Sequence, residues 1–344
     1  MRSSGQTVKC SGMEIVLPSC KAFKFETPEP CPKAHGVTLV IGKRGSGKTV
    51  AAVNLIEKME FDRVFCISPS VKSNLEMMER LNLQEEDIFE DPDDLGAMDA
   101  VKAAVEKERD DLEEYWQKKL RYDRIMRELE AGEEDPLTWE EERVLEFLVD
   151  GELKPPYHKY GGKEPMMCLL LDDMLGSRIF SSPRKLNQFC IYHRHLGQFK
   201  KGGALGVSLF FLVQSYKTQV GGLTRTIRNQ ATTIILFQSK SEKEMEDIAE
   251  EVGGEVSAMQ FYDVYNRAIL EKHDFLFIDL HKKDEHPSMF RRNFDEFLLY
   301  DGCDSDLVDP YIPPPKVLNQ AEREQEYKNA GNGGVTKGSS SKKG

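Results

Sequence analysis

Apolar residues in this chain gather into short continuous runs that predict buried strands. These runs, rich in leucine, phenylalanine and β-branched residues, occupy 37–41, 166–171, 207–213, 232–237 and 275–279. Between them, residues 50–59 carry apolar positions at helical spacing, and 97–129 is rich in strong helix formers without Pro or Gly. Continuous apolar strands separated by helices predict a three-layer α/β domain with a mostly parallel sheet. Residues 264–280 are expected to add later strands, with 275–279 the clearest.

The polar segments divide the chain further. Residues 84–163 form an acidic stretch in which the helix at 97–129 precedes a capping-box sequence at 138–141, which predicts a second helix to residue 149. We expect this stretch to be a helical insertion that protrudes from the domain. Residues 1–31 form an N-terminal extension and 32–300 the main domain. The Pro-rich, then Asn/Gly/Ser/Lys-rich residues 301–344 predict a disordered tail.

A complete phosphate-binding pattern, G-x-x-x-x-G-K-[ST], follows the first predicted strand and opens the first predicted helix. Its residues are Gly42, Lys43, Arg44, Gly45, Ser46, Gly47, Lys48 and Thr49. In this motif the glycines let backbone N–H groups face the phosphates, the lysine reaches the terminal phosphates, and the threonine hydroxyl binds Mg²⁺. The alternative is a glycine turn that matches by chance. The strand and helix on either side favour a site for ATP and Mg²⁺.

Two further strands end in polar residues suited to the same site. The run at 166–171 ends in Asp172 and Asp173. Asp172 is expected to hold Mg²⁺ and Asp173 to act as the general base that orients the attacking water. The strand at 207–213 ends in Gln214, which is expected to contact the γ-phosphate or the water. Taken alone, Gln214 would more often be a solvent contact at a strand end.

Arg225 and Arg228 precede the strand at 232–237. Either guanidinium is suited to act as an arginine finger toward the ATP of a neighbouring subunit. The alternative is a surface ion pair, but the nearest acidic residues in the sequence are Asp173 and Glu242. The scarcity of nearby partners favours the functional interpretation.

The net charge of −12 is unevenly distributed. Residues 84–151 contain 25 Asp and Glu against 9 Lys and Arg, whereas residues 174–241 contain ten Lys and Arg and no acid. The second stretch predicts a polyanion-binding surface, or else a solvated face with a few phosphate-binding arginines.

Seven cysteines, including Cys10, Cys20 and Cys31 at spacings atypical of zinc sites, indicate free thiols in a reducing compartment. We expect neither a signal peptide nor a membrane span.

Taken together, these segments resemble the poxvirus-type genome-packaging ATPases of nucleocytoplasmic large DNA viruses, within the FtsK/HerA superfamily. The resemblance covers 32–300 without the insertion. Besides the two nucleotide motifs, it rests on segments 192–197, 214–216 and 224–230. It implies a RecA-like P-loop NTPase that forms a homo-oligomeric ring and pumps double-stranded DNA into a capsid. A capsid or portal-type partner and a location in the host cytoplasm or the virion follow from the same resemblance.

The resemblance also implies the roles given above for Lys48, Thr49, Asp172, Asp173 and Gln214, with Arg225 or Arg228 as the finger. Two departures stand out: a lengthened segment at 198–203, which is suited to face DNA, and the large insertion. Two other classes of P-loop protein remain as alternatives. One is a nucleotide or metabolic kinase, and the other is a nucleotide-switch scaffold that moves nothing.

Overall fold

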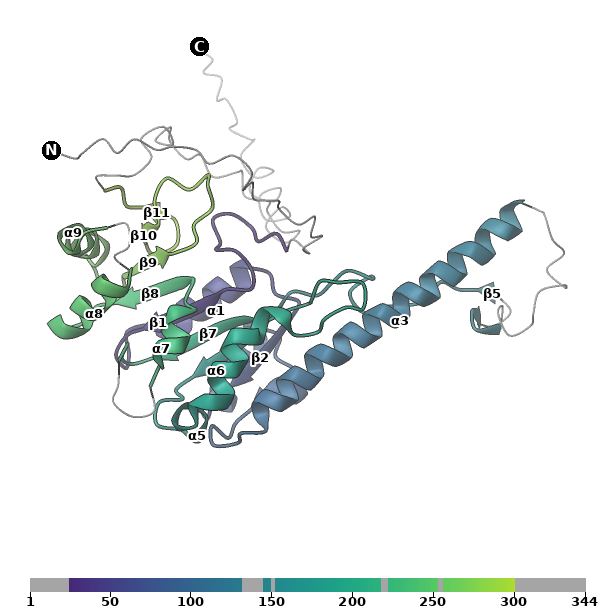
Figure 1. The fold of residues 1–344 in the computed structure, drawn as a ribbon, viewed down its shortest axis with the longest axis horizontal. Coiled ribbons are helices and arrows are strands. Elements are labelled where there is room, and N and C mark those ends of the chain that lie inside the picture. Colours follow the sequence, from purple (N-terminus) through teal and green to yellow (C-terminus); the bar gives the residue numbers. More distant parts are fainter. Residues whose placement is uncertain (1–24, 132–144, 150–151, 218–221, 253–255, 301–344) are drawn as a thin grey trace, which may run out of the picture. The chain divides into compact units, whose positions relative to one another are not determined.

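The computed structural model describes residues 25–131, 145–149, 152–217, 222–252 and 256–300. Within these ranges the chain forms a nine-stranded sheet in the order β11-β10-β9-β8-β1-β7-β6-β2-β3 (Figure 1). The strands are β1 (Val37–Ile41), β2 (Arg63–Ile67), β3 (Ile88–Phe89), β6 (Met167–Asp172), β7 (Ser208–Val213), β8 (Thr233–Phe237), β9 (Phe275–Asp279), β10 (Phe290–Arg292) and β11 (Glu296–Phe297). The first six are parallel and the last three pair antiparallel. The predicted mostly parallel α/β fold is confirmed.

Helices cover both faces of this sheet. They are α1 (Lys48–Lys58), α2 (Leu75–Arg80), α3 (Ala97–Ala131), α5 (Arg178–Ser181), α6 (Pro183–Tyr192), α7 (Arg225–Asn229), α8 (Glu242–Val252) and α9 (Ala258–Ala268), with short 3-10 turns at Val71–Ser73, Glu85–Asp87 and His193–His195. Side chains alternate along β1: Leu39 packs with the core under α3 and α5 to α9, and Val40 packs with α1 and α2. No helix in the described ranges is long and apolar enough to cross a bilayer.

The acidic insertion is partly built into this core. β3 lies inside the range 84–163 and pairs with β2 at the edge of the main sheet. α3 begins at Ala97, as predicted, but its Val101, Val105 and Leu112 are fully buried in the sheet's core. The expectation that the whole insertion protrudes is therefore wrong for its first half. The helical period places apolar residues on one face of α3, and that face needs a partner to bury it.

The second half of α3 packs against the returning chain. The rings of Tyr122 and Phe147 meet edge to face at 5.5 Å. The chain then forms a small hairpin of β4 (Leu148–Val149) and β5 (Glu152–Leu153). The second predicted helix was expected to reach residue 149, but residues 148 and 149 form strand β4, so its predicted end is wrong. Residues 138–144 of that prediction lie outside the described ranges. A second correction concerns 264–268, predicted as strand, which form the end of α9.

A buried ion-pair cluster joins the insertion to the sheet. Arg63, the first residue of β2, donates to both carboxylate oxygens of Asp87, at 2.8 and 2.6 Å, and to Glu108 of α3 at 2.5 Å. The side chains of Asp87 and Glu108 are each only 2% exposed. Lys159, from the segment that returns to the sheet, also donates to Glu108. Charges this deeply buried require partners, so the cluster holds three chain segments together.

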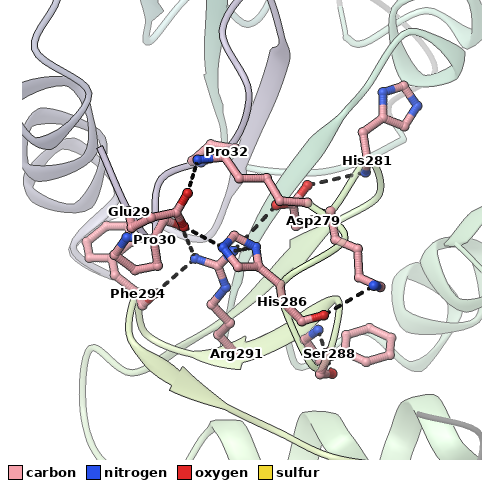
Figure 2. A network of polar contacts seen from close by, with 12 residues as sticks. Glu29, Pro30, Pro32, Asp279, His281, His286, Ser288, Arg291 and Phe294 are labelled. Atoms are coloured by element: carbon pink, nitrogen blue, oxygen red, sulfur yellow. Dashed lines mark hydrogen bonds and ion pairs between the residues drawn. The ribbon is translucent and has the colours of Figure 1, made fainter. Parts of the chain in front are cut away.

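Residues 25–31 belong with the domain, although the sequence places them in the N-terminal extension. Figure 2 shows the buried polar network that binds them to β9 and β10. Arg291, only 1% exposed, donates to Asp279 at 3.4 Å, to the carbonyl of Pro30 and to Nδ1 of His286 at 3.1 Å. Burial lowers the pKa of His286, and its other nitrogen, Nε2, donates to Glu29 at 2.7 Å. The predicted tail at 301–344 lies outside the described residues.

His193 is a second buried histidine, and its titration affects stability. Its side chain is buried, and Nδ1 donates to the carbonyl of Val207, the residue before β7, at 2.6 Å. Burial lowers the pKa of His193 to about 4, and nearby Arg194, His35 and His195 act in the same direction. The folded-state pKa thus lies below the unfolded-state value. The stability that neutral His193 contributes is therefore present near pH 7 and is lost as the pH falls toward 4.

Replacing His193 with Asn should flatten this pH dependence, because the amide can donate to the same carbonyl but does not titrate. Between pH 7 and pH 4 the free energy of unfolding of the variant should fall by up to about 3 kcal/mol less than that of the parent. Urea denaturation of both proteins across this range provides the measurement. Parallel pH curves would show that the pKa of His193 does not differ between the folded and the unfolded protein.

Candidate active site

The phosphate loop connects the carboxyl end of β1 to the start of α1, as predicted. Gly45 and Gly47 have φ angles of 76° and 105°, a region that other residues rarely adopt. Gly42 is required for space: a Cβ there would lie 2.5 Å from Oγ of Ser46 and 2.9 Å from Cβ of Phe237. The glycine positions of the motif are thus set by backbone conformation and close packing.

Polar groups in the loop fit a bound phosphate chain. Nζ of Lys48 donates to the carbonyls of Gly42 and Lys43, at 2.7 and 3.2 Å, which holds the ammonium group across the loop. Burial lowers the pKa of Lys48, so a nearby anion would stabilise its charged form. Oγ of Ser46 is buried and finds no hydrogen-bond partner among the described residues. Phosphate oxygens would supply acceptors for both of these groups.

Thr49 and Asp172 meet beside the loop. Asp172 is the last residue of β6, and Thr49 lies in the first turn of α1; the threonine Oγ1 donates to Oδ2 of Asp172 at 3.3 Å. Burial raises the pKa of Asp172, so a cation would stabilise its carboxylate. In the described residues no cluster of three or more His, Cys, Asp or Glu is suited to hold a metal ion. These two oxygens fit Mg²⁺, which takes few protein ligands and completes its shell with phosphate and water.

Asp173 and Gln214 come together at the same edge of the sheet. β7 lies between β1 and β6, so its carboxyl end brings Gln214 between the loop and Asp173. Nε2 of Gln214 donates to Oδ1 of Asp173 at 3.4 Å, and both side chains are exposed. Asp173 has a φ of 54°, a conformation that residues other than glycine adopt mainly at functional or tightly held positions. The structure therefore gathers the loop, both carboxylates and the amide around one exposed edge.

The two arginines have different surroundings. Arg228, whose side chain is 10% exposed, pairs with Glu251 of α8 at 3.1 Å and donates to the carbonyl of Leu223 at 2.7 Å. Its guanidinium also lies over the ring of Tyr216, 5.3 Å from the centroid. Arg225 is exposed and forms no ion pair within the described part of the chain. The argument from scarce acidic partners is thus wrong for Arg228, because α8 brings a carboxylate to it.

Neither arginine makes a hydrogen bond to the loop, Asp172 or Asp173 in the ranges that the structure covers.

The stretch 174–241 contains no acidic residue, but acidic residues from elsewhere in the chain lie next to it in the fold. Acids of α3 and α8 pair with several of its lysines: Lys185 with Asp99 at 2.8 Å, Lys200 with Glu113 at 3.2 Å, and Lys217 with Asp247 at 2.7 Å. Three lysines of the stretch are thus paired with acids from outside it, whereas its other exposed basic residues are Arg178, Arg184, Arg194, Lys201, Arg225 and Lys240.

Sequence reasoning missed two sets of contacts near the site. Glu244 of α8 accepts hydrogen bonds from Oγ of Ser215 at 3.0 Å, from the Tyr216 amide at 2.8 Å and from Oγ of Ser239 at 2.6 Å. It therefore connects the ends of β7 and β8. His273, just before β9, contacts the phosphate loop itself. No local pattern signals either contact, because each partner comes from a different part of the chain.

Comparisons with known proteins give distant structural likenesses. No family model and no curated protein matches the sequence. The structure is similar to the genome packaging NTPase B204 from Sulfolobus turreted icosahedral virus 2 in complex with sulfate, at 13% identity and a TM-score of 0.39, over 77% of this chain and 98% of that one. It is also similar to the conjugation coupling protein TcpA of pCW3 with ATPgS, at 17% identity and a TM-score of 0.35, over 76% of this chain and 61% of that one. A third similar structure is VirB4 of Thermoanaerobacter pseudethanolicus, at 14% identity and a TM-score of 0.37, over 77% of this chain and 89% of that one. At these TM-scores the likenesses assign no activity to this chain.

Proposed function

We propose that this chain is a Mg²⁺-dependent ATPase that drives double-stranded DNA translocation and packages a viral genome into a capsid. The observation that carries the ATPase part is the contact between Thr49 and Asp172 beside the phosphate loop, with Asp173 and Gln214 adjacent. The DNA-translocation part is supported by the resemblance of the sequence segments described above.

Each residue of the candidate site has its own role in this proposed hydrolysis. Lys48 and the loop amides bind the phosphates, and Thr49 and Asp172 hold Mg²⁺, which neutralises phosphate charge when bound. Asp173 accepts a proton from the attacking water. The hydrogen bond from Gln214 orients the carboxylate of Asp173 and supports the hydrolase interpretation over a kinase, which has no need to hold water there.

Gln214 is also suited to transmit the state of the site. The residues that follow it, Ser215 and Tyr216, are both hydrogen-bonded to Glu244 of α8. Tyr216 in turn contacts Glu251 and Arg228. A shift of Gln214 when the γ-phosphate leaves would therefore act directly on α8 and α7, which lie on the helical face of the sheet opposite α1.

The packaging role brings further proposals. We propose a homo-oligomeric ring, a capsid or portal-type protein as partner, and action in the host cytoplasm or the virion. Within such a ring, Arg225 is the better candidate for the finger that reaches a neighbour's ATP. It is exposed, whereas Arg228 is held by Glu251 within its own chain.

The test is ATP hydrolysis measured with and without double-stranded DNA, with Lys48→Ala as the inactive control. A DNA translocase should be stimulated by DNA, a kinase by a small acceptor, and a nucleotide switch by neither. Hydrolysis that is absent, or indifferent to DNA of any length, would contradict the translocase proposal.

Mixing inactive variants tests the finger. Arg225→Ala and Lys48→Ala should each be inactive alone, but a random 1:1 mixture should place an intact loop beside an intact arginine at about a quarter of the interfaces. Hydrolysis should therefore recover partly in the mixture. Arg228→Ala is the matched control. Because the contacts of Arg228 lie within one chain, any hydrolysis that this variant loses should not be recovered by mixing it with Lys48→Ala. No recovery with Arg225→Ala, in subunits that sedimentation shows to assemble, would rule out a role in trans.

A further inference from the structure

The turn before β9 contacts the phosphate loop through His273. Nδ1 of His273 lies 2.9 Å from the carbonyl oxygen of Ser46. A carbonyl can only accept, so Nδ1 carries the proton and donates it. The ring also lies beside the next residue: a Cβ on Gly47 would be 3.5 Å from Nδ1. The contact thus falls on the peptide bond between Ser46 and Gly47.

The orientation of this peptide decides where its N–H points. In a trans peptide the carbonyl of one residue and the N–H of the next point in opposite directions. Because His273 holds the Ser46 carbonyl on its own side, the Gly47 N–H is directed to the other side. Within the described residues this N–H has no backbone acceptor. Amides at such loop positions are the groups that bind phosphate oxygens.

The position of His273 is itself enforced. Its φ is 74°, which is unfavourable for a residue other than glycine. The neighbouring carboxylate of Asp274 fixes the turn by accepting hydrogen bonds from the amide of Glu271 at 2.8 Å, from Arg292 at 3.0 Å and from Asn293 at 3.1 Å. The backbone at His273 is therefore held in an uncommon conformation beside a buried anchor, a combination typical of positioned functional residues.

We propose that His273 is a positioning residue of the phosphate loop. Its ring fixes the Ser46–Gly47 peptide so that the Gly47 N–H binds a phosphate that ATP and ADP share. This inference rests on the proposed nucleotide binding. Because the contact is the same before and during hydrolysis, His273 contributes to nucleotide affinity and KM and leaves kcat unchanged.

The experiment compares His273→Ala with His273→Asn. Ala removes the donor, whereas Nδ2 of Asn is as many bonds from the backbone as Nδ1 of His, and Asn tolerates a positive φ. Calorimetric titration should show that the Ala variant binds ADP and a non-hydrolysable ATP analogue about tenfold more weakly. The Asn variant should bind close to the parental affinity. At saturating ATP, both should keep the parental kcat, and thermal melting without nucleotide reports on folding.

The outcomes separate this inference from the proposed function. If the parent binds neither nucleotide, both fail. If the parent binds, Lys48→Ala abolishes binding and His273→Ala binds as tightly as the parent, the nucleotide site stands and the role of His273 is wrong. A folded Asn variant that binds tenfold more weakly would also overturn the role, even where the Ala variant melts too low to be compared.

Discussion

Replacing Asp173 with Asn should lower kcat for ATP hydrolysis by a factor of about 10²–10⁴, the usual contribution of a general base, and should leave nucleotide binding intact. Asn has nearly the same shape, tolerates the φ of 54° at this position and can still accept from Gln214, but it cannot take a proton from water. Steady-state hydrolysis at saturating Mg²⁺-ATP, with titration of a non-hydrolysable analogue, measures the two quantities separately.

Lys48→Ala is the contrasting control, because it removes the charge that is proposed to contact the phosphates and should weaken binding itself. The two variants should thus lose activity for different reasons. Should Asp173→Asn hydrolyse ATP at the parental rate, Asp173 is not the base and another carboxylate must be sought.

Replacing Arg63 with Met should lower the free energy of unfolding by about 3–5 kcal/mol, because it removes one partner of a buried ion pair. The carboxylates of Asp87 and Glu108 would remain inside the protein, each 2% exposed. Glu108 keeps Lys159, whereas Asp87 loses both of its hydrogen bonds to Arg63. Denaturation in guanidinium chloride gives the measurement.

The exposed pair of Lys72 and Glu90 provides a matched control. Nζ of Lys72 and Oε1 of Glu90 lie 2.6 Å apart, but the two side chains are 62% and 49% exposed, so Lys72→Met should leave the free energy of unfolding nearly unchanged. Adding Asp87→Asn to Arg63→Met should restore part of the loss, because the unpaired charge is removed. Equal effects of Arg63→Met and Lys72→Met would show that the buried cluster does not stabilise the domain.

Local patterns predicted much of the fold and the order of its motifs. The apolar runs at 37–41 and 207–213 became neighbouring parallel strands because continuous apolar runs favour burial on both faces. The helix at Ala97–Ala131 followed from strong helix formers without Pro or Gly. The strands β2, β3, β10 and β11 were not predicted; β3, for example, pairs through only two residues, which carry too little pattern to recognise.

The sequence by itself determined the strands at 37–41, 166–171, 207–213, 232–237 and 275–279, the phosphate loop and the positions of Asp172 and Asp173, because these depend on hydrophobic period and on glycine conformations within a few residues. Only the tertiary structure decided which charges meet. Glu251 reaches Arg228 and Glu113 reaches Lys200 because helices distant in sequence pack against the same sheet. His273 meets Ser46 across 227 positions because antiparallel β9 starts at the edge where β1 ends. Such contacts follow from the order of strands in the sheet, which no local period encodes.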